Sequence, residues 1–174
     1  MNRLKIIVNG DIHTSIQTTN LATVLYLDYC GKFFPNNQWT DLTYPVLCMW
    51  TYNLIRYKDS KDIKFELYFM DGPYRMDVHI DSNMQLTIDC INSTKDEIIE
   101  LTIKCSYCEL VSALNNAFNS FNHVLQYNDL NEGRFEPIYR QSLLCRTELK
   151  AVISNVTQRD CKSHNKSLGD CTST

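Results

Sequence analysis

Four short segments between residues 62 and 104 alternate apolar with polar side chains, one residue at a time. In the first segment, Phe65 and Leu67 alternate with Lys64 and Glu66. The other three segments cover residues 75–80, 84–90 and 99–104. This period of two is typical of antiparallel strands that bury one face and expose the other to water. Because clusters of Asp, Asn, Ser, Gly and Pro separate the segments, we expect a four-strand antiparallel meander.

Apolar residues at helical spacing predict about three helices outside this meander. The first helix spans roughly residues 39–57, with Asp41 or Thr43 as its cap. The second begins at Ser106-x-x-Glu109, which predicts a capping box in which each side chain bonds the other residue's backbone N–H. These helices would cover one face of the sheet.

The region before the first helix predicts short N-terminal strands. Residues 4–8 and 22–29 are rich in Leu, Ile, Val and Tyr. Asn9-Gly10 favours a type I′ turn into a further short segment, because both residues accept positive φ. These strands could extend the same sheet or pack elsewhere. The expected fold class is α+β, with an antiparallel sheet packed on one face by helices.

The C-terminal third of the chain predicts one more helix and then a tail. The helix begins near Pro137, and its apolar residues recur at helical spacing. From Ser154 onward the chain consists largely of Ser, Thr, Asn, Lys and Asp, with almost nothing to bury. We therefore expect a single domain over residues 1–153 and a polar, flexible tail over residues 154–174.

Composition excludes several classes of protein. The chain has 174 residues, a net charge of −3 and a pI near 5.8, which argues against the basic patch that nucleic-acid binding requires. No segment approaches the roughly 20 apolar residues of a membrane span. The apolar run at the N-terminus is too short for a secretory signal. We therefore expect a cytoplasmic protein with reduced thiols and with neither nucleic acid nor membrane as a partner.

Eight cysteines are spaced irregularly along the chain. Cys105-Ser-Tyr-Cys108 lies where a strand meets a helix N-terminus, a position that lowers a thiol pKa and favours redox chemistry. The preceding meander lacks the βαβ unit of thioredoxin-like proteins, so we interpret these cysteines as structural. A zinc site would need Cys161 and His164 as further ligands, and the polar segment that carries them lacks other ordering signals.

The histidines form no recognisable catalytic arrangement. His13 lies two residues from Asp11, and His79 lies on the polar side of the meander. A general base needs a nucleophile or a bound water within hydrogen-bond reach. No Gly-x-Ser-x-Gly, His-Glu-x-x-His or glycine-rich phosphate-binding motif supplies a partner. The sequence therefore predicts a protein that is not an enzyme, with no catalytic residues, cofactor or metal.

Acidic side chains from all four meander strands share the polar side of the expected sheet. They are Glu66, Asp77, Asp89 and Glu100, with His79 among them. Such a face is usually only solvated, but acidic groups that face a basic partner speed association and sharpen specificity. We therefore predict that these five residues form a partner-binding surface.

Two motifs resemble small bacterial immunity proteins of polymorphic toxin and contact-dependent growth inhibition systems. The first is Phe34-Pro35-x-x-x-Trp39-x-Asp41-Leu42-x-x-x-Val46-Leu47-x-x-Trp50, and the second is Phe69-Met70-Asp71-Gly72-Pro73-Tyr74. The similarity covers roughly residues 22–110.

The resemblance implies a protein that binds a cognate toxin domain, commonly a nuclease, and neutralises it by occluding its active site or substrate channel. It carries over no catalytic or binding residues. Two alternatives remain open from the sequence. One is a thiol-dependent redox protein that uses Cys105 and Cys108, and the other is a non-catalytic scaffold or oligomerisation module.

Overall fold

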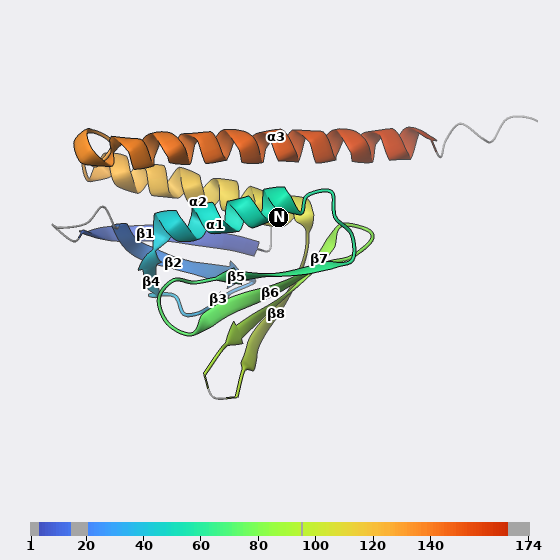
Figure 1. The fold of residues 1–174 in the computed structure, drawn as a ribbon, viewed down its shortest axis with the longest axis horizontal. Coiled ribbons are helices and arrows are strands. Elements are labelled where there is room, and N and C mark those ends of the chain that lie inside the picture. Colours follow the sequence, from blue (N-terminus) through green and yellow to red (C-terminus); the bar gives the residue numbers. More distant parts are fainter. Residues whose placement is uncertain (1–3, 15–20, 95, 167–174) are drawn as a thin grey trace, which may run out of the picture.

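The structure is a computed structural model that describes residues 4–14, 21–94 and 96–166, with only the backbone described at 11–14 and 156–166 (Figure 1). Helices gather on one side of the molecule and strands on the other (Figure 1). The elements are β1 (Leu4–Thr14), β2 (Leu21–Tyr29), β3 (Lys32–Phe34), β4 (Thr40–Leu42), α1 (Thr43–Arg56), β5 (Ile63–Tyr68), β6 (Tyr74–Ile80), β7 (Gln85–Asn92), β8 (Ile98–Ser106), α2 (Tyr107–Tyr127), the 3-10 helix η1 (Gly133–Phe135) and α3 (Glu136–Lys166).

The described strands form two antiparallel sheets. In sheet A, β2 pairs with β1 along one edge and with β3 and β4 along the other. Sheet B is the meander β5-β6-β7-β8, in which each strand pairs with the next. The predicted α+β fold class is confirmed. The N-terminal strands form a sheet of their own and do not extend the meander.

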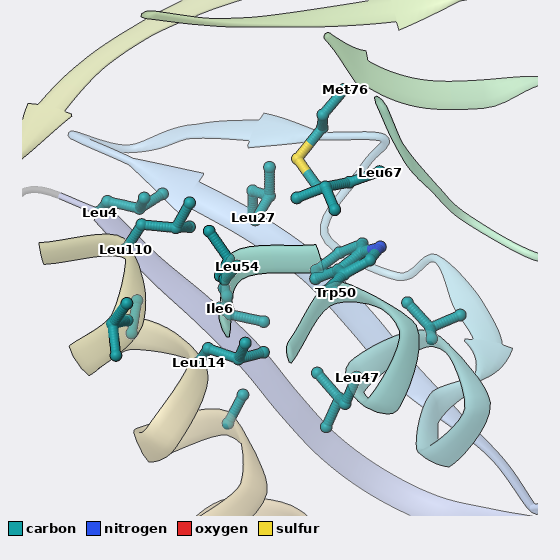
Figure 2. Packing of buried hydrophobic residues seen from close by; sticks show 14 of the residues in the cluster. Leu4, Ile6, Leu27, Leu47, Trp50, Leu54, Leu67, Met76, Leu110 and Leu114 are labelled. Carbon is teal, nitrogen blue, oxygen red and sulfur yellow. The ribbon is translucent and has the colours of Figure 1, made fainter. Parts of the chain in front are cut away.

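One hydrophobic core joins both sheets to the three α-helices. In Figure 2, side chains from β1, β2, α1, α2, β5 and β6 converge on this core. The labelled residues are Leu4, Ile6, Leu27, Leu47, Trp50, Leu54, Leu67, Met76, Leu110 and Leu114. The buried Trp50 indole donates its Nε1–H to the carbonyl oxygen of Tyr68 at 2.9 Å, so this polar group is satisfied inside the core.

The predicted alternation of sheet B fails at the start of β8. Cys90 pairs with Leu101, but the next residue, Ile91, pairs with Ile99, so Glu100 is an extra residue in a β-bulge. An extra residue reverses the side-chain alternation beyond it. Ile99 is 54% exposed and Ile98 is 53% exposed, although the sequence pattern predicts Ile99 on the buried face.

The predicted turn at Asn9-Gly10 is wrong. Strand β1 continues through it to Thr14, with a register irregularity against β2 between Asn9 and His13. Gly10 has a positive φ of +87° at this register irregularity, where the strand does not turn into a hairpin. A tight hairpin instead joins β2 to β3 through Cys30 and Gly31, whose φ values are both positive, as a type I′ turn requires.

Helix α1 begins at Thr43, later than predicted, because residues 40–42 pair with β2 as β4. Its N-cap is Leu42, which makes no side-chain cap bond, so the predicted capping by Asp41 or Thr43 is wrong. One half of the predicted capping box of α2 is confirmed: the Ser106 Oγ accepts the Glu109 N–H at 3.2 Å. The bond that the structure gives for the Glu109 Oε1 comes from the N–H of Leu4.

Helix α3 lies along α2 and extends beyond it (Figure 1). Its backbone continues to Lys166, past residue 153, where the sequence predicts the domain to end. The segment from Ser154 to Lys166 contains no glycine or proline, so no helix-breaking residue stops the helix earlier. Residues 167–174 of the predicted tail lie outside the described residues. No helix in the described part of the chain combines the length and apolarity that a membrane span requires.

Candidate functional site

A groove of about 710 Å³ opens on sheet B and is lined by side chains from α1, β5, β6 and β7. We refer to it as the sheet B groove. The strands contribute mainly the polar residues that alternate with buried ones, and the C-terminal end of α1 adds an amide and an aromatic ring. Its lining residues are Asn53, Tyr57, Lys64, Phe65, Glu66, Tyr68, Asp77, Val78, His79, Thr87 and Asp89.

The strand register aligns three carboxylates across this groove. Glu66 pairs directly with Asp77, and Asp77 pairs with Asp89. Side chains on directly opposed residues start about 5 Å apart, so the three carboxylates form a line across β5, β6 and β7. We call this line the acidic row. Like charges in such positions repel one another, which makes the row costly unless another group compensates for it.

Each carboxylate of the acidic row is held by one donor from the protein. The Tyr68 hydroxyl donates to Glu66 Oε2. Thr102 Oγ1 donates to Asp89 Oδ1 at 2.6 Å, and an arginine on β6 donates to Asp77 Oδ1. Within the described residues, the second oxygen of each carboxylate accepts no hydrogen bond. These oxygens can therefore accept donors from another molecule.

Arg75 is the cation closest to the acidic row, and it is committed to partners within the protein. Its Nε donates to Asp77 at 2.9 Å, and its Nη1 donates to Glu97 at 3.1 Å and to Ser93 Oγ at 2.7 Å. These bonds raise the pKa of Arg75 and lower the pKa of Glu97. Since one guanidinium is shared between two carboxylates, Arg75 does not neutralise the whole row.

Four of the five predicted partner-binding residues line the sheet B groove. These are Glu66, Asp77, His79 and Asp89. The fifth, Glu100, does not line it. Glu100 is the extra residue of the β8 bulge, and its Oε1 accepts a bond from Asn92 Nδ2 at 2.9 Å.

Sequence reasoning missed the aromatic and amide residues of the groove. Tyr68 follows the same alternation as Glu66, so its place on the polar face was available from the strand pattern. Asn53 lies on α1 and Tyr57 directly follows it, and only the packing of α1 against β5 brings them to the groove. The stacked rings of Tyr57 and Phe65, 4.9 Å apart, make this contact, and no local sequence pattern reports it.

The thiols of the Cys105-Ser-Tyr-Cys108 motif lie outside the sheet B groove. Cys105 is buried on the core face of β8, and burial raises the pKa of its thiol to about 12. A redox-active cysteine needs the opposite shift, because the thiolate is the reactive form. The structure therefore gives no support to redox chemistry at Cys105.

The other candidate ligands are outside the described side chains. These are His13, Cys161 and His164. Among the side chains that the structure does describe, no group of three or more His, Cys, Asp or Glu residues is arranged to hold a metal ion.

The two motifs that carry the family resemblance pack against each other. Trp39 contacts Tyr74 edge-on at 4.8 Å, and Phe34 contacts both Tyr74 and Phe69 at 5.6 and 5.8 Å. Trp50 contacts Phe69 at 5.1 Å. We call these five residues the aromatic junction. They join sheet A and α1 to the hairpin between β5 and β6, so the motif residues have a structural role.

Comparisons of the chain with protein-family models, with curated proteins and with solved structures find no match.

Proposed function

We propose that this protein is an immunity protein that binds and neutralises a cognate toxin domain, such as a nuclease, by occluding its active site or substrate channel. The observation that carries the proposal is the acidic row, whose three aligned carboxylates each keep one oxygen available to an external donor. A protein that acts on nucleic acid exposes cationic side chains to phosphate. A line of carboxylates is complementary in charge to such a cationic surface.

The chemistry of the groove favours a partner that presents arginine or lysine. Carboxylates accept charge-assisted bonds from guanidinium groups, often in bidentate geometry. The hydroxyl donors on Glu66 and Asp89 hold these carboxylates in place before binding, and preorganised groups lose less conformational entropy on association. The acidic field would also raise the association rate with a cationic partner.

The rings beside the acidic row supply apolar contact area. Tyr68 is 44% exposed, and Tyr57 lines the same groove. Tyrosine is enriched where interfaces derive most of their binding energy. A rigid aromatic rim around a charged centre therefore fits a protein-binding surface.

Co-expression with a candidate toxin domain tests the proposal. The first candidate is the C-terminal domain of any large secreted toxin encoded next to this chain. We expect the chain to restore growth and to elute from gel filtration in a complex with that domain. Continued growth arrest, with the two proteins eluting separately, would reject the proposed function for that pair.

A further inference from the structure

A second groove, of about 590 Å³, lies between α1 and α3. We call it the α1–α3 groove. Its walls carry aromatic, apolar and polar side chains from both helices, and they include two cysteines far apart in the chain, Cys48 and Cys145. Both cysteines are thiols in the structure. The sheet B groove shares no lining residue with it.

The two thiols line the same groove, and they interact through a chain of side chains that starts at Tyr44. The Tyr44 hydroxyl donates to the sulfur of Cys48, and the Cys48 thiol donates to the sulfur of Cys145. The side chain of Gln141 also bonds to Cys145. Two cysteines that line one open groove and interact with each other form a dithiol site.

The hydrogen bonds assign different roles to the two sulfurs. The bond from Cys48 lowers the pKa of Cys145, although burial and the charge of Glu148 act in the opposite direction. The same bond and burial raise the pKa of Cys48. Cys145 is therefore the sulfur that ionises first, and Cys48 is the neighbouring thiol.

We propose that Cys48 and Cys145 form an oxidisable dithiol site, which hydrogen peroxide converts into a disulfide linking α1 to α3. In the first step the Cys145 thiolate attacks one peroxide oxygen, the O–O bond breaks, and the leaving hydroxide takes a proton to become water. Cys145 is then a sulfenic acid. In the second step the Cys48 sulfur attacks the Cys145 sulfur, the S–O bond breaks, and the departing hydroxide leaves as water with the Cys48 proton.

The overall reaction is balanced. Two thiols lose two electrons and two protons, and the peroxide is reduced to two molecules of water. The sulfurs must approach from hydrogen-bonding distance to about 2 Å, which rotation about the Cα–Cβ bonds of both residues would provide. The disulfide would link α1 to α3 and would not involve the residues of the acidic row. This proposal is therefore independent of toxin binding.

Three of the other described cysteines, Cys30, Cys90 and Cys105, lack one or both features of this site. Cys30 is exposed on the hairpin between β2 and β3, and no cysteine contact is found for it among the described residues. Burial raises the pKa of both Cys90 and Cys105. The oxidation of these three cysteines can therefore be compared with that of Cys48 and Cys145 in the same protein.

Peptide mapping of the full-length protein tests the proposal. The reduced protein is treated with hydrogen peroxide, remaining thiols are alkylated, and the digest is analysed by mass spectrometry with and without a reductant. We expect a cross-linked peptide pair containing Cys48 and Cys145, lighter by about 2 Da than the two reduced peptides together, that disappears on reduction. Mapping is needed because the chain has eight cysteines, and a change in total mass does not identify which of them react.

Variants assign the order of the steps. Cys145→Ser should slow oxidation of Cys48 by about tenfold or more, because the neighbouring thiol alone ionises poorly. In Cys48→Ser, Cys145 should accumulate as sulfenic or sulfinic acid, because its resolving thiol is missing. Cys30→Ser should leave the rate of the Cys48–Cys145 cross-link within about twofold of wild type.

The wild-type map decides the question even if a variant folds poorly. Recovery of Cys48 and Cys145 as separately alkylated residues after complete peroxide treatment would overturn the proposal, as would a dominant cross-link between other cysteines.

Binding of phenylarsine oxide gives a second measurement, because this trivalent arsenical bridges neighbouring thiols. We expect stoichiometric binding that prior peroxide treatment abolishes, and absence of binding by the folded, reduced protein would contradict thiol contact.

Discussion

Gly72 allows the hairpin between β5 and β6 to lie against the Trp39 indole. Its φ is +68°, and a Cβ added at this position would lie 2.7 Å from Cη2 of Trp39. The indole has little freedom to move, because it packs on Tyr74 and its Nε1 donates to Asp41. Gly31 also has a positive φ, +82°, but a Cβ there would meet nothing within 4 Å.

Alanine at these two positions separates backbone strain from steric overlap. We expect Gly31→Ala to lower the free energy of unfolding by about 1 kcal/mol, which is the cost of positive φ alone. Gly72→Ala should lower it by about 3 kcal/mol, because overlap with the indole adds to that strain. Urea unfolding curves measure both. Equal losses would show that the contact with Trp39 carries no energetic weight.

Asp41 is a buried carboxylate that links sheet A to the hairpin between β5 and β6. It accepts the backbone N–H groups of Leu42, Met70 and Asp71 and the indole N–H of Trp39. The sequence predicts Asp41 as a helix cap, but two of its four donors, Met70 and Asp71, lie about thirty residues further along the chain. Local patterns cannot find such a partner, because the contact depends on how the two sheets pack.

The pH dependence of stability tests the burial of Asp41. Burial raises the pKa of Asp41 above its ordinary value of 3.8, although the hydrogen bonds lower it. As the pH rises through this window, the unfolded state loses its proton before the folded state does, so stability falls. Wild type should therefore lose stability relative to Asp41→Asn in urea unfolding as the pH rises above 3.8. A difference that grows in favour of wild type would mean that the hydrogen bonds outweigh burial.

At the scale of elements, residues at the N-terminus of α2 connect this helix to β1 and to α1. The Ser106 hydroxyl caps the helix by accepting the Glu109 N–H. The Glu109 carboxylate accepts the N–H of Leu4 at 3.1 Å, which ties α2 to the start of β1. The Tyr107 hydroxyl donates to the carbonyl of Leu54 at 2.6 Å, at the C-terminal end of α1.

Removal of the α2 cap should have a modest and specific effect. We expect Ser106→Ala to lower the free energy of unfolding by about 1 kcal/mol, because a helix N–H loses its acceptor. The control is Ser112→Ala inside α2, which should be neutral or slightly stabilising because alanine favours the helix. Chemical denaturation measures the free energy of unfolding of both variants. Equal losses of this free energy would argue against a capping role for Ser106.

Elements with strong local periodicity could be predicted from the sequence. The meander and the apolar stripe of α2 follow from residue spacing alone, and the stripe residues Leu110, Leu114 and Phe118 are buried as expected. Strands β3 and β4 are three residues each, too short to give a pattern. The β8 bulge at Glu100 also escapes prediction, because a bulge is defined by register against a neighbouring strand.

At the scale of the whole molecule, the layering leaves one face of sheet B available to a partner. The helices gather on the other side of the molecule (Figure 1), and of the helices only the C-terminal end of α1 borders the groove among the described residues. Strand alternation alone predicts that the acidic residues share a face. Their alignment into a row requires the register of Glu66, Asp77 and Asp89 across three strands. The contribution of α1 to the groove could not be predicted, because it depends on tertiary packing.

If the acidic row serves binding, repulsion among its carboxylates should destabilise the free protein. Neutralising it with Glu66→Gln, Asp77→Asn and Asp89→Asn removes repulsion between opposed like charges and also the Arg75 ion pair. A control variant carries three neutralised carboxylates outside sheet B: Asp129→Asn, Glu132→Gln and Glu148→Gln. Both variants must first be shown to be folded, with urea midpoints no lower than that of wild type.

The most direct test is the dissociation constant of each variant for the cognate toxin domain, measured by calorimetry at a fixed salt concentration. Neutralising the acidic row should weaken binding by about 100-fold or more, since charge pairs at an interface contribute about 1.5 kcal/mol or more each. The control variant should bind within about threefold of wild type. Wild-type affinity in the acidic-row variant, or an equal loss in the control, would contradict the assignment of this face as the binding surface.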